Sequence, residues 1–175
     1  MPEVLDHYTG FAEVLRLDPP GMVALKADLA DPDLAGALEI PVPAVRRWQE
    51  GPGGRALWMA PDELLLLVPD AGAAVARMAG RMAGRHVTVA DASGLRAAFA
   101  LRGTGARDVL AKLMPVDFAD FPPGSLRRSR AAQVAALVWA DDEGFGLMTA
   151  RSVADYAWAL LTTSARPGGE VGLYR

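Results

Sequence analysis

The apolar run at residues 64–68 constrains the fold more than any other segment of the chain. It reads Leu-Leu-Leu-Leu-Val, so it has no polar side to turn toward water. It has the length of a strand, and it is far shorter than the roughly 20 apolar residues that a membrane span requires. Because a strand without a polar side must be covered on both faces, the run predicts a central strand of a sheet. Its expected antiparallel partner is residues 56–59, across a turn that contains Pro61.

The remaining strand-like segments are short and are separated by turns rich in glycine and proline, which number 18 and 13. Glycine permits positive φ and proline fixes φ, so both residues favour turns. The turn at residues 18–21 is expected to join the first two strands into a hairpin, and the sequence at 51–54 predicts a flexible loop. The pattern predicts strands at residues 11–17, 22–28, 45–48, 86–90, 95–101, 126–131, 134–140 and 145–149.

Four segments are expected to be helical. Asp31 followed by Pro32 marks the start of a short helix, and Asp70 can cap a helix that extends to about residue 83. A third helix begins near Thr104. Ser152, with an acidic residue three positions later, resembles a capping box at the start of the fourth. Hairpins interspersed with about four helices predict an α+β fold with antiparallel sheets.

The length of 175 residues predicts a single domain, which we assign to residues 1–163. Residues 164–175 are expected to form a loose carboxy-terminal tail.

Composition excludes several classes of function. The chain has no cysteine, so it cannot form a disulfide, a thiolate nucleophile, an iron–sulfur ligand or a cysteine-based zinc site. The net charge of −3 argues against nucleic acid as a partner. No apolar run is long enough to cross a membrane, and the first residues do not have the pattern of a signal peptide. We therefore expect a cytoplasmic protein with no nucleic-acid or membrane partner.

The motifs that could carry chemistry have simpler structural interpretations. His7 and His86 are the only histidines and have no second ligand at a familiar spacing, so we expect surface positions for both. Gly103-Thr104-Gly105 precedes a predicted helix and could face a phosphate, but Asp108 stands where the third glycine of a dinucleotide motif would be. A tight turn from a strand into a helix is the favoured interpretation.

Clustered charges also favour structural roles. Arg127, Arg128 and Arg130 predict a charged edge strand, with an acidic partner surface as the alternative. The neighbouring carboxylates at 62–63 and 141–143 lie in predicted turns, where water keeps acid–base properties ordinary. We therefore expect no catalytic, cofactor-binding or metal-binding residues in this chain.

The order of five further motifs resembles one family across residues 11–161. The motifs are GMVAL at 21–25 with ADL at 27–29, ALWMAPDELLL at 56–66, DAS at 91–93, LRGTGARDVL at 101–110 and RSVADYAW at 151–158. Together they resemble the gamma subunit of heterotetrameric sarcosine oxidase, a family related to the aminomethyltransferase (T-protein) of the glycine cleavage system. The resemblance implies an aminomethyltransferase-like, folate-binding-domain-like fold.

The resemblance also implies a function. It implies a noncatalytic structural subunit that supports the flavin-bearing subunits in the oxidative demethylation of sarcosine to glycine. It implies alpha, beta and delta subunits as partners. FAD, FMN, NAD, tetrahydrofolate and zinc would then be carried by those other subunits and not by this chain.

One alternative is a stand-alone folate-binding protein of the aminomethyltransferase kind. That function needs an acid directed at the folate amine, and Asp91 and Asp108 are the only candidates. The other interpretation of these two residues is structural, with Asp91 in a turn and Asp108 in a helix.

Overall fold

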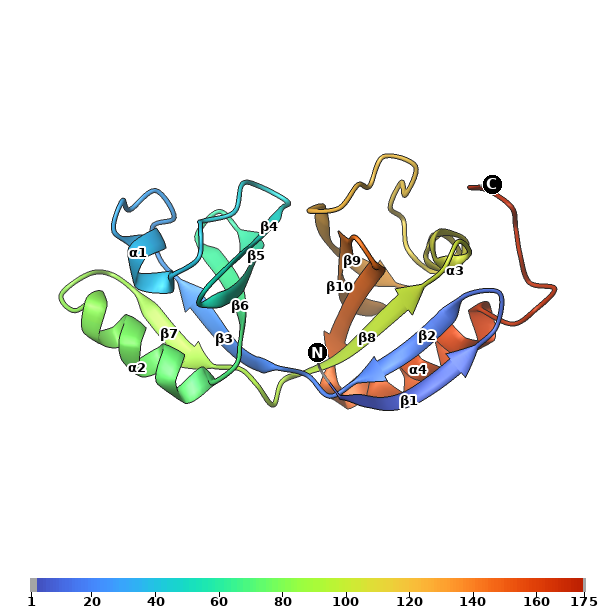
Figure 1. Ribbon diagram of the computed structural model, residues 1–175, viewed down its shortest axis with the longest axis horizontal. Helices are drawn as coiled ribbons and strands as arrows, with labels where there is room; N and C mark the ends of the chain where they lie inside the picture. Colours follow the sequence, from blue (N-terminus) through green and yellow to red (C-terminus); the bar gives the residue numbers. More distant parts are fainter. Residues whose placement is uncertain (1–2, 175) are drawn as a thin grey trace. The chain divides into compact units, whose positions relative to one another are not determined.

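The computed structural model of the chain describes residues 3–174, which form two compact units. One unit combines residues 3–19 with residues 95–174, and the other consists of residues 20–94 (Figure 1). We call them the split unit and the continuous unit. Each contains one sheet whose strands pair in antiparallel fashion. With four α-helices in the described residues, the α+β prediction is confirmed.

The continuous unit is built on a five-stranded sheet with β6 in its centre. The strand order is β4-β5-β6-β3-β7, so the apolar run at 64–68 lies in the middle strand, as predicted. All its side chains except that of Leu67 are buried. The strands are β3 (Gly21–Lys26), β4 (Trp48–Gly51), β5 (Gly54–Ala60), β6 (Glu63–Val68) and β7 (Thr88–Asp91).

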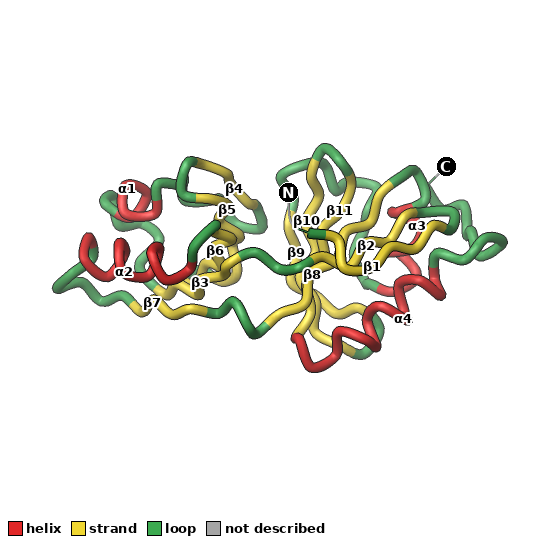
Figure 2. Tube along the Cα trace, turned by 60° about the horizontal axis from the view of Figure 1, so that its bottom comes forward, coloured by secondary structure: helices red, strands yellow, loops and turns green. Residues whose placement is uncertain are grey.

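Two helices pack on one face of this sheet. Helix α1 (Leu34–Leu38) and helix α2 (Ala71–Arg81) lie next to each other (Figure 2). They contribute Leu34, Leu38 and Met78 to a core shared with β3 and β6. The Asp70 side chain accepts a hydrogen bond of 2.9 Å from the backbone N–H of Ala73 and caps α2, as predicted. The apolar spacing of α2 thus matches the face that it buries.

The split unit contains a six-stranded sheet in the order β1-β2-β8-β11-β10-β9. The predicted hairpin of β9 and β10 is confirmed, and β9 lies at the sheet edge, as its arginines predict. The strands are β1 (Val4–Thr9), β2 (Glu13–Leu17), β8 (Arg96–Arg102), β9 (Leu126–Ala131), β10 (Val134–Asp141) and β11 (Gly144–Ala150).

Helices α3 (Ala106–Leu113) and α4 (Ala154–Ser164) pack into the core of the split unit. A short 3-10 helix, η1 (Arg151–Val153), leads into α4. Three of the aromatic rings in this core contact one another: Phe118 lies edge-on to Phe121 and Phe145, with ring centroids 5.4 and 5.7 Å away. All three side chains are buried, as is that of Phe99 in the same core.

The predicted first hairpin is wrong. Strands β2 and β3 both exist, but β2 pairs with β1 and β8, whereas β3 pairs with β6 and β7 in the other sheet. The turn residues at 18–20 correctly indicate a change of direction, but they carry no information on which strand each neighbour pairs with. Strand β1, absent from the prediction, is the true hairpin partner of β2.

The segment around residue 50 also differs from its prediction. The strand begins at Trp48 rather than at residue 45, and residues 51–54 form a tight hairpin turn in which Gly51 pairs with Gly54. A side chain at Gly53 would overlap the carbonyl oxygen of Leu38. The glycines therefore serve close packing against α1, and not the flexibility that their number suggests.

Three predicted helix caps are displaced. Helix α1 begins at Leu34 after Asp33, not after Asp31, because the Asp31 carboxylate accepts a hydrogen bond of 2.9 Å from the Asp33 N–H in the turn that precedes the helix. Ser152 makes no capping hydrogen bond, because η1 precedes α4 and puts Val153 at the helix start. Asp155 instead accepts a hydrogen bond of 2.8 Å from Arg16. Helix α3 starts after Gly105, not after Thr104, and also lacks a side-chain cap. Local sequence located all four helices, but of the four predicted caps only Asp70 acts as one.

Candidate functional site

A buried carboxylate in the first turn of α3 holds the carboxy-terminal segment. Asp108 is 6% exposed, and its two oxygens accept hydrogen bonds from three successive backbone N–H groups. The N···O distances are 2.7 Å for Gly172, 3.2 Å for Leu173 and 3.3 Å for Tyr174. A charged acceptor forms stronger hydrogen bonds than a neutral one, so this is a specific anchor for residues 172–174.

The Tyr174 side chain provides a second attachment. Its hydroxyl oxygen accepts a hydrogen bond of 3.2 Å from the backbone N–H of Phe118. Its ring is partly buried against the core that contains the three phenylalanines. Because Phe118 is fully buried, the segment is attached to the interior of the split unit as well as to α3.

The Gly103-Thr104-Gly105 motif shapes the turn that presents Asp108. Gly103 has a φ of +85°, a conformation that favours glycine. A side chain at Gly105 would overlap the carbonyl oxygen and the ring of Phe11. The predicted tight turn from strand to helix is confirmed, and the second glycine is required by the close approach of Phe11.

A small pocket borders the anchor. It has a volume of about 290 Å³ and is lined by Phe11, Thr104, Gly105, Asp108, Glu170 and Tyr174. Lys112 lies beside it, with its ammonium 4.7 Å from the centre of the Phe11 ring and 2.8 Å from the carbonyl oxygen of Ser164. The one buried carboxylate here is already engaged by three N–H groups, so the arrangement is suited to holding a peptide segment.

Asp91, the other candidate acid for folate, closes a turn in the continuous unit. Its carboxylate accepts hydrogen bonds from the hydroxyl and the backbone N–H of Ser93, at 2.6 and 2.9 Å. These two hydrogen bonds lower the pKa of Asp91 from its usual range. The Ser93 hydroxyl oxygen also accepts a hydrogen bond of 3.0 Å from the backbone N–H of Met22. Asp91 and Asp108 lie in different units and both organise backbone.

The two histidines belong to different units, and each lies on the surface of its own unit. His7 is on β1, about half exposed, with Nε2 3.8 Å from Glu13. His86 is exposed in the connection before β7. Within residues 3–174, no three side chains of metal-ligating type come together.

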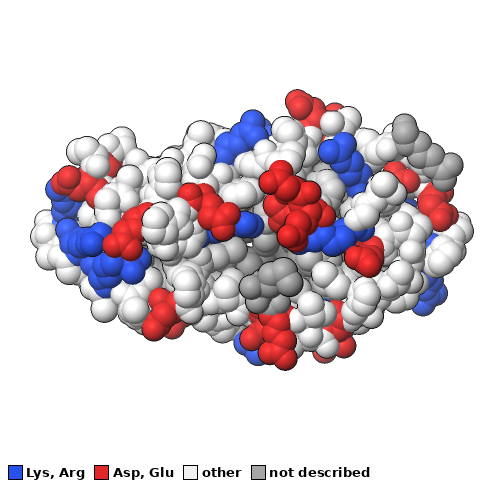
Figure 3. All heavy atoms as spheres, in the orientation of Figure 1, with Lys and Arg blue, Asp and Glu red and all other residues white. Residues whose placement is uncertain are grey.

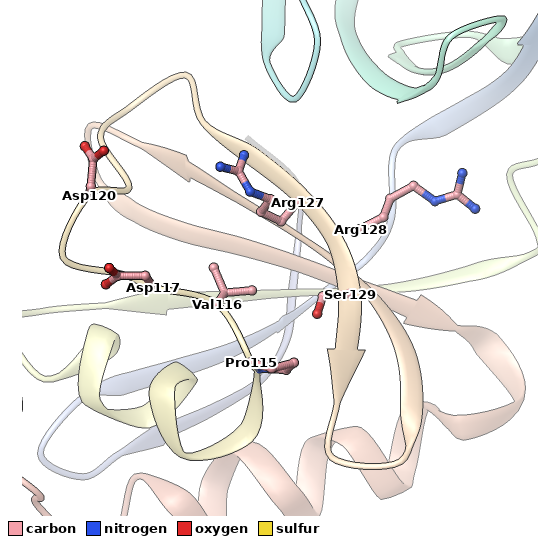
Figure 4. Close-up of a pocket in the computed structure, with 7 residues that line it drawn as sticks. All are labelled: Pro115, Val116, Asp117, Asp120, Arg127, Arg128 and Ser129. Carbon is pink, nitrogen blue, oxygen red and sulfur yellow. The ribbon is translucent and has the colours of Figure 1, made fainter.

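The arginine cluster lines a second pocket, of about 330 Å³, between β9 and the loop at 115–120. Asp117 and Asp120 line it together with Arg127 and Arg128 (Figure 4). Arg127 lies 5.6 Å from the Phe121 ring, and Figure 4 shows Arg128 extending away from both carboxylates. The arginines thus do not converge on a common point.

The carboxylates of the predicted turns form ion pairs. Asp62 lies 3.1 Å from Lys26, and Arg102 lies 3.6 Å from Asp141 and 3.1 Å from Glu143. Acidic and basic side chains are interspersed over the face of the molecule shown in Figure 3. No helix within the described range is long and apolar enough to span a membrane.

Sequence reasoning did not find Tyr174 or Phe118 as parts of the anchor. Asp108 was named as a candidate acid, but its role depends on a segment 64 residues further along the chain. The sequence signal available for this anchor was Tyr174, an aromatic residue that follows the glycines at 168–169 and 172.

Comparisons with known proteins identify the fold class and then the family. A chain of the heterotetrameric sarcosine oxidase from Corynebacterium sp. U-96, solved in complex with pyrrole 2-carboxylate, aligns with a TM-score of 0.82 at 22% identity. The alignment covers 91% of this chain and 87% of that one. Aminomethyltransferase T of the glycine cleavage system from Bartonella henselae aligns with a TM-score of 0.66 at 17% identity. That alignment covers 90% of this chain and 47% of the other, so the predicted aminomethyltransferase-like fold is confirmed.

The model of one sequence family matches residues 26–166. The chain therefore belongs to the sarcosine oxidase, gamma subunit family. A search of curated protein sequences gave no match.

Proposed function

We propose that this chain is a noncatalytic gamma subunit of a heterotetrameric sarcosine oxidase that works in the cytoplasm. It supports the flavin-bearing subunits as they oxidatively demethylate sarcosine to glycine. The observation that carries the proposal is the family match over residues 26–166, which includes parts of both compact units. The structural similarity to a chain of the Corynebacterium enzyme supports it.

The local geometry fits a structural role. The carboxylates most suited to acid–base chemistry, Asp91 and Asp108, are both used to hold backbone N–H groups in place. We accordingly assign no catalytic, cofactor-binding or metal-binding residue to this chain. FAD, FMN, NAD, tetrahydrofolate and zinc would be bound by the alpha, beta and delta subunits, with which this chain assembles.

The test is co-purification from the native host, with a tag on the full-length chain. We expect the larger flavin-bearing chains to be recovered in fixed ratio, with flavin absorbance and sarcosine-dependent hydrogen peroxide production. An untagged strain is the control. Recovery of a colourless chain without defined partners would contradict the proposal.

The folate-binding alternative has its own test. Titration calorimetry of the isolated chain with tetrahydrofolate should give no binding heat. A saturable signal that is lost in the Asp91→Asn or Asp108→Asn variant would favour the alternative, and the Asp62→Asn variant serves as a control at an exposed turn.

A further inference from the structure

The pocket between β9 and the loop that follows α3 is lined by side chains of opposite charge. Asp117 and Asp120 line it from the loop, and β9 contributes Arg127 and Ser129. These two β9 residues are two positions apart, so their side chains leave the same face of the strand. Arg128 also borders the pocket, but its side chain leaves the other face. Figure 4 shows Arg127 on the side of β9 where both carboxylates lie.

The loop holds its two carboxylates in place through the residues beside them. Asp117 is followed by Phe118 and Asp120 by Phe121, and both rings are buried in the core of the split unit. Asp117 also accepts a hydrogen bond of 2.9 Å from the backbone N–H of Ala119. Neither carboxylate forms an ion pair with another residue in the described part of the chain. The loop therefore presents two negative charges from an anchored backbone.

The guanidinium of Arg127 is also held in position. It lies 5.6 Å from the centre of the Phe121 ring, and one of its nitrogens donates a hydrogen bond of 2.8 Å to the carbonyl oxygen of Leu126. A guanidinium carries five N–H donors in a planar fork that matches a carboxylate, so it can bind one while it keeps both contacts. Because no ion pair joins it to the loop carboxylates, the opposite charges border one space without neutralising each other.

The size and the remaining lining indicate the kind of ligand. The pocket has a volume of about 330 Å³, which is at the lower end of the range for small-molecule sites. Pro115 and Val116 add apolar surface that suits a short aliphatic group. A simple anion would be repelled by two carboxylates, and a simple cation would be repelled by the guanidinium. A small molecule that carries both charges complements the whole lining.

We propose that this pocket binds a small α-amino acid in its zwitterionic form. The carboxylate of the amino acid binds the guanidinium of Arg127 and the hydroxyl of Ser129. Its ammonium group lies between Asp117 and Asp120, and its side chain packs on the apolar part of the lining. The inference goes beyond the proposed function and does not depend on it, since every lining residue belongs to the split unit of this chain.

The test is a nuclear magnetic resonance titration of the full-length, isotope-labelled chain with L-alanine. The backbone amide signals of residues 116–120 and 127–129 should shift until the site is saturated. Methylamine carries only the positive charge of the amino acid, and acetate carries only the negative one. Each should bind about tenfold more weakly than L-alanine, because each lacks one set of charge-assisted hydrogen bonds.

Two neighbouring arginines of β9 provide a matched pair of variants. Arg127→Gln should weaken L-alanine binding by about tenfold and leave it no tighter than methylamine binding, because the partner of the ligand carboxylate is lost. Arg128→Gln is the control. It removes the same charge one position along the strand, from a side chain on the other face, and should bind L-alanine like the unmodified chain.

A variant of the loop tests the other end of the ligand. Asp117→Asn removes the charge but keeps a side-chain oxygen that can accept the Ala119 N–H, so the turn is retained. This variant should weaken L-alanine binding by about tenfold while acetate binding is not weakened.

Three results would overturn the inference. The first is the absence of saturable shifts of the pocket amides with L-alanine, and the second is equal loss of affinity in Arg127→Gln and Arg128→Gln. The third is binding of methylamine or acetate as tight as that of L-alanine, which would define a site for a single ion. Hydrogen exchange of β10, the strand paired with β9, shows whether each variant is folded. If Arg127→Gln loses that protection, Asp117→Asn decides the question.

Discussion

The two compact units contain sheets of similar size but are assembled from the chain in opposite ways. The continuous unit uses one stretch, residues 20–94, in which β3 pairs with the later strands β6 and β7. The split unit brings residues 3–19 together with residues 95–174. Its core joins α3, α4 and the carboxy-terminal segment, so its integrity depends on contacts between distant segments. Both sheets therefore combine hairpins between consecutive strands with pairings between distant strands, which involve β3 in the continuous unit and β8 in the split unit.

The largest expected effect is in the aromatic core of the split unit. Phe118→Ala should lower the free energy of unfolding of that unit by about 3–5 kcal/mol, because it removes a fully buried ring and leaves a cavity. Hydrogen exchange measured segment by segment should show loss of protection in β8 and β11. Protection in β3 and β6 of the continuous unit should be retained. Equal loss in both sheets would show that the two units unfold together.

A glycine comparison should give effects of opposite sign. Gly105→Ala should destabilise the split unit by about 1–3 kcal/mol, because the new methyl group would overlap Phe11. Gly80→Ala is the matched control in α2, where a side chain meets no atom within 4 Å. It should stabilise the continuous unit by about 0.5–1 kcal/mol through its greater helix propensity. Urea denaturation of both variants measures the difference in their free energies of unfolding. Destabilisation by Gly80→Ala would contradict the expectation that a side chain fits at this position.

Substitutions at Asp70 and Ser152, one in each unit, should change stability by smaller amounts. Asp70→Ala should destabilise α2 by about 1 kcal/mol, because it removes the hydrogen bond to the Ala73 N–H. Ser152→Ala should change stability by less than about 0.5 kcal/mol, since Ser152 caps no helix. Thermal denaturation followed by circular dichroism tests both variants. A similar loss for Ser152→Ala would mean that it caps α4 in solution.

The smallest expected effect is a pH dependence in the continuous unit. The backbone N–H of Asp33 and the Arg85 guanidinium lower the pKa of Asp31 below its usual 3.8. A lowered folded-state pKa stabilises the fold above the unfolded-state pKa, and this contribution is lost as the pH falls through the lowered value. Acid should therefore weaken protection of α1 below about pH 4. The Asp31→Asn variant should lack this pH dependence of α1 protection. An identical pH profile in the variant and the unmodified protein would show that Asp31 does not cause it.

Sequence reasoning succeeded where structure depends on neighbours along the chain. The run at 64–68, the Asp70 cap and the β9–β10 hairpin each follow from local pattern and were predicted correctly. The pairing of β2 with β8 was not predicted, because nothing in a turn sequence specifies a partner about 80 residues away. Strand β1 was missed for a related reason: it is an exposed edge strand, and its side chains lack a clear apolar alternation.

The candidate site was recognised only in part. Asp108 stood out because it follows a glycine turn, but both its burial and its partners depend on residues 172–174. The single domain over residues 1–163 and the loose tail over 164–175 stay predictions. The structure instead holds residues 172–174 through the contacts of Asp108 and Tyr174. Hydrogen exchange of the amides of these three residues measures whether the segment is held or loose in solution.

The pairing of β2 with β8 has a consequence for the modularity of the chain. Leu17 and Ala98 are direct partners in neighbouring strands, so the entire continuous unit is inserted where an ordinary hairpin would have a short loop. The ends of that unit are also adjacent, since Val23 pairs with Asp91. Residues 20–94 therefore leave and re-enter the split unit at one position, between the neighbouring strands β2 and β8. Insertion at a hairpin loop is a common route by which one small fold acquires a second, and it leaves each free to diverge separately.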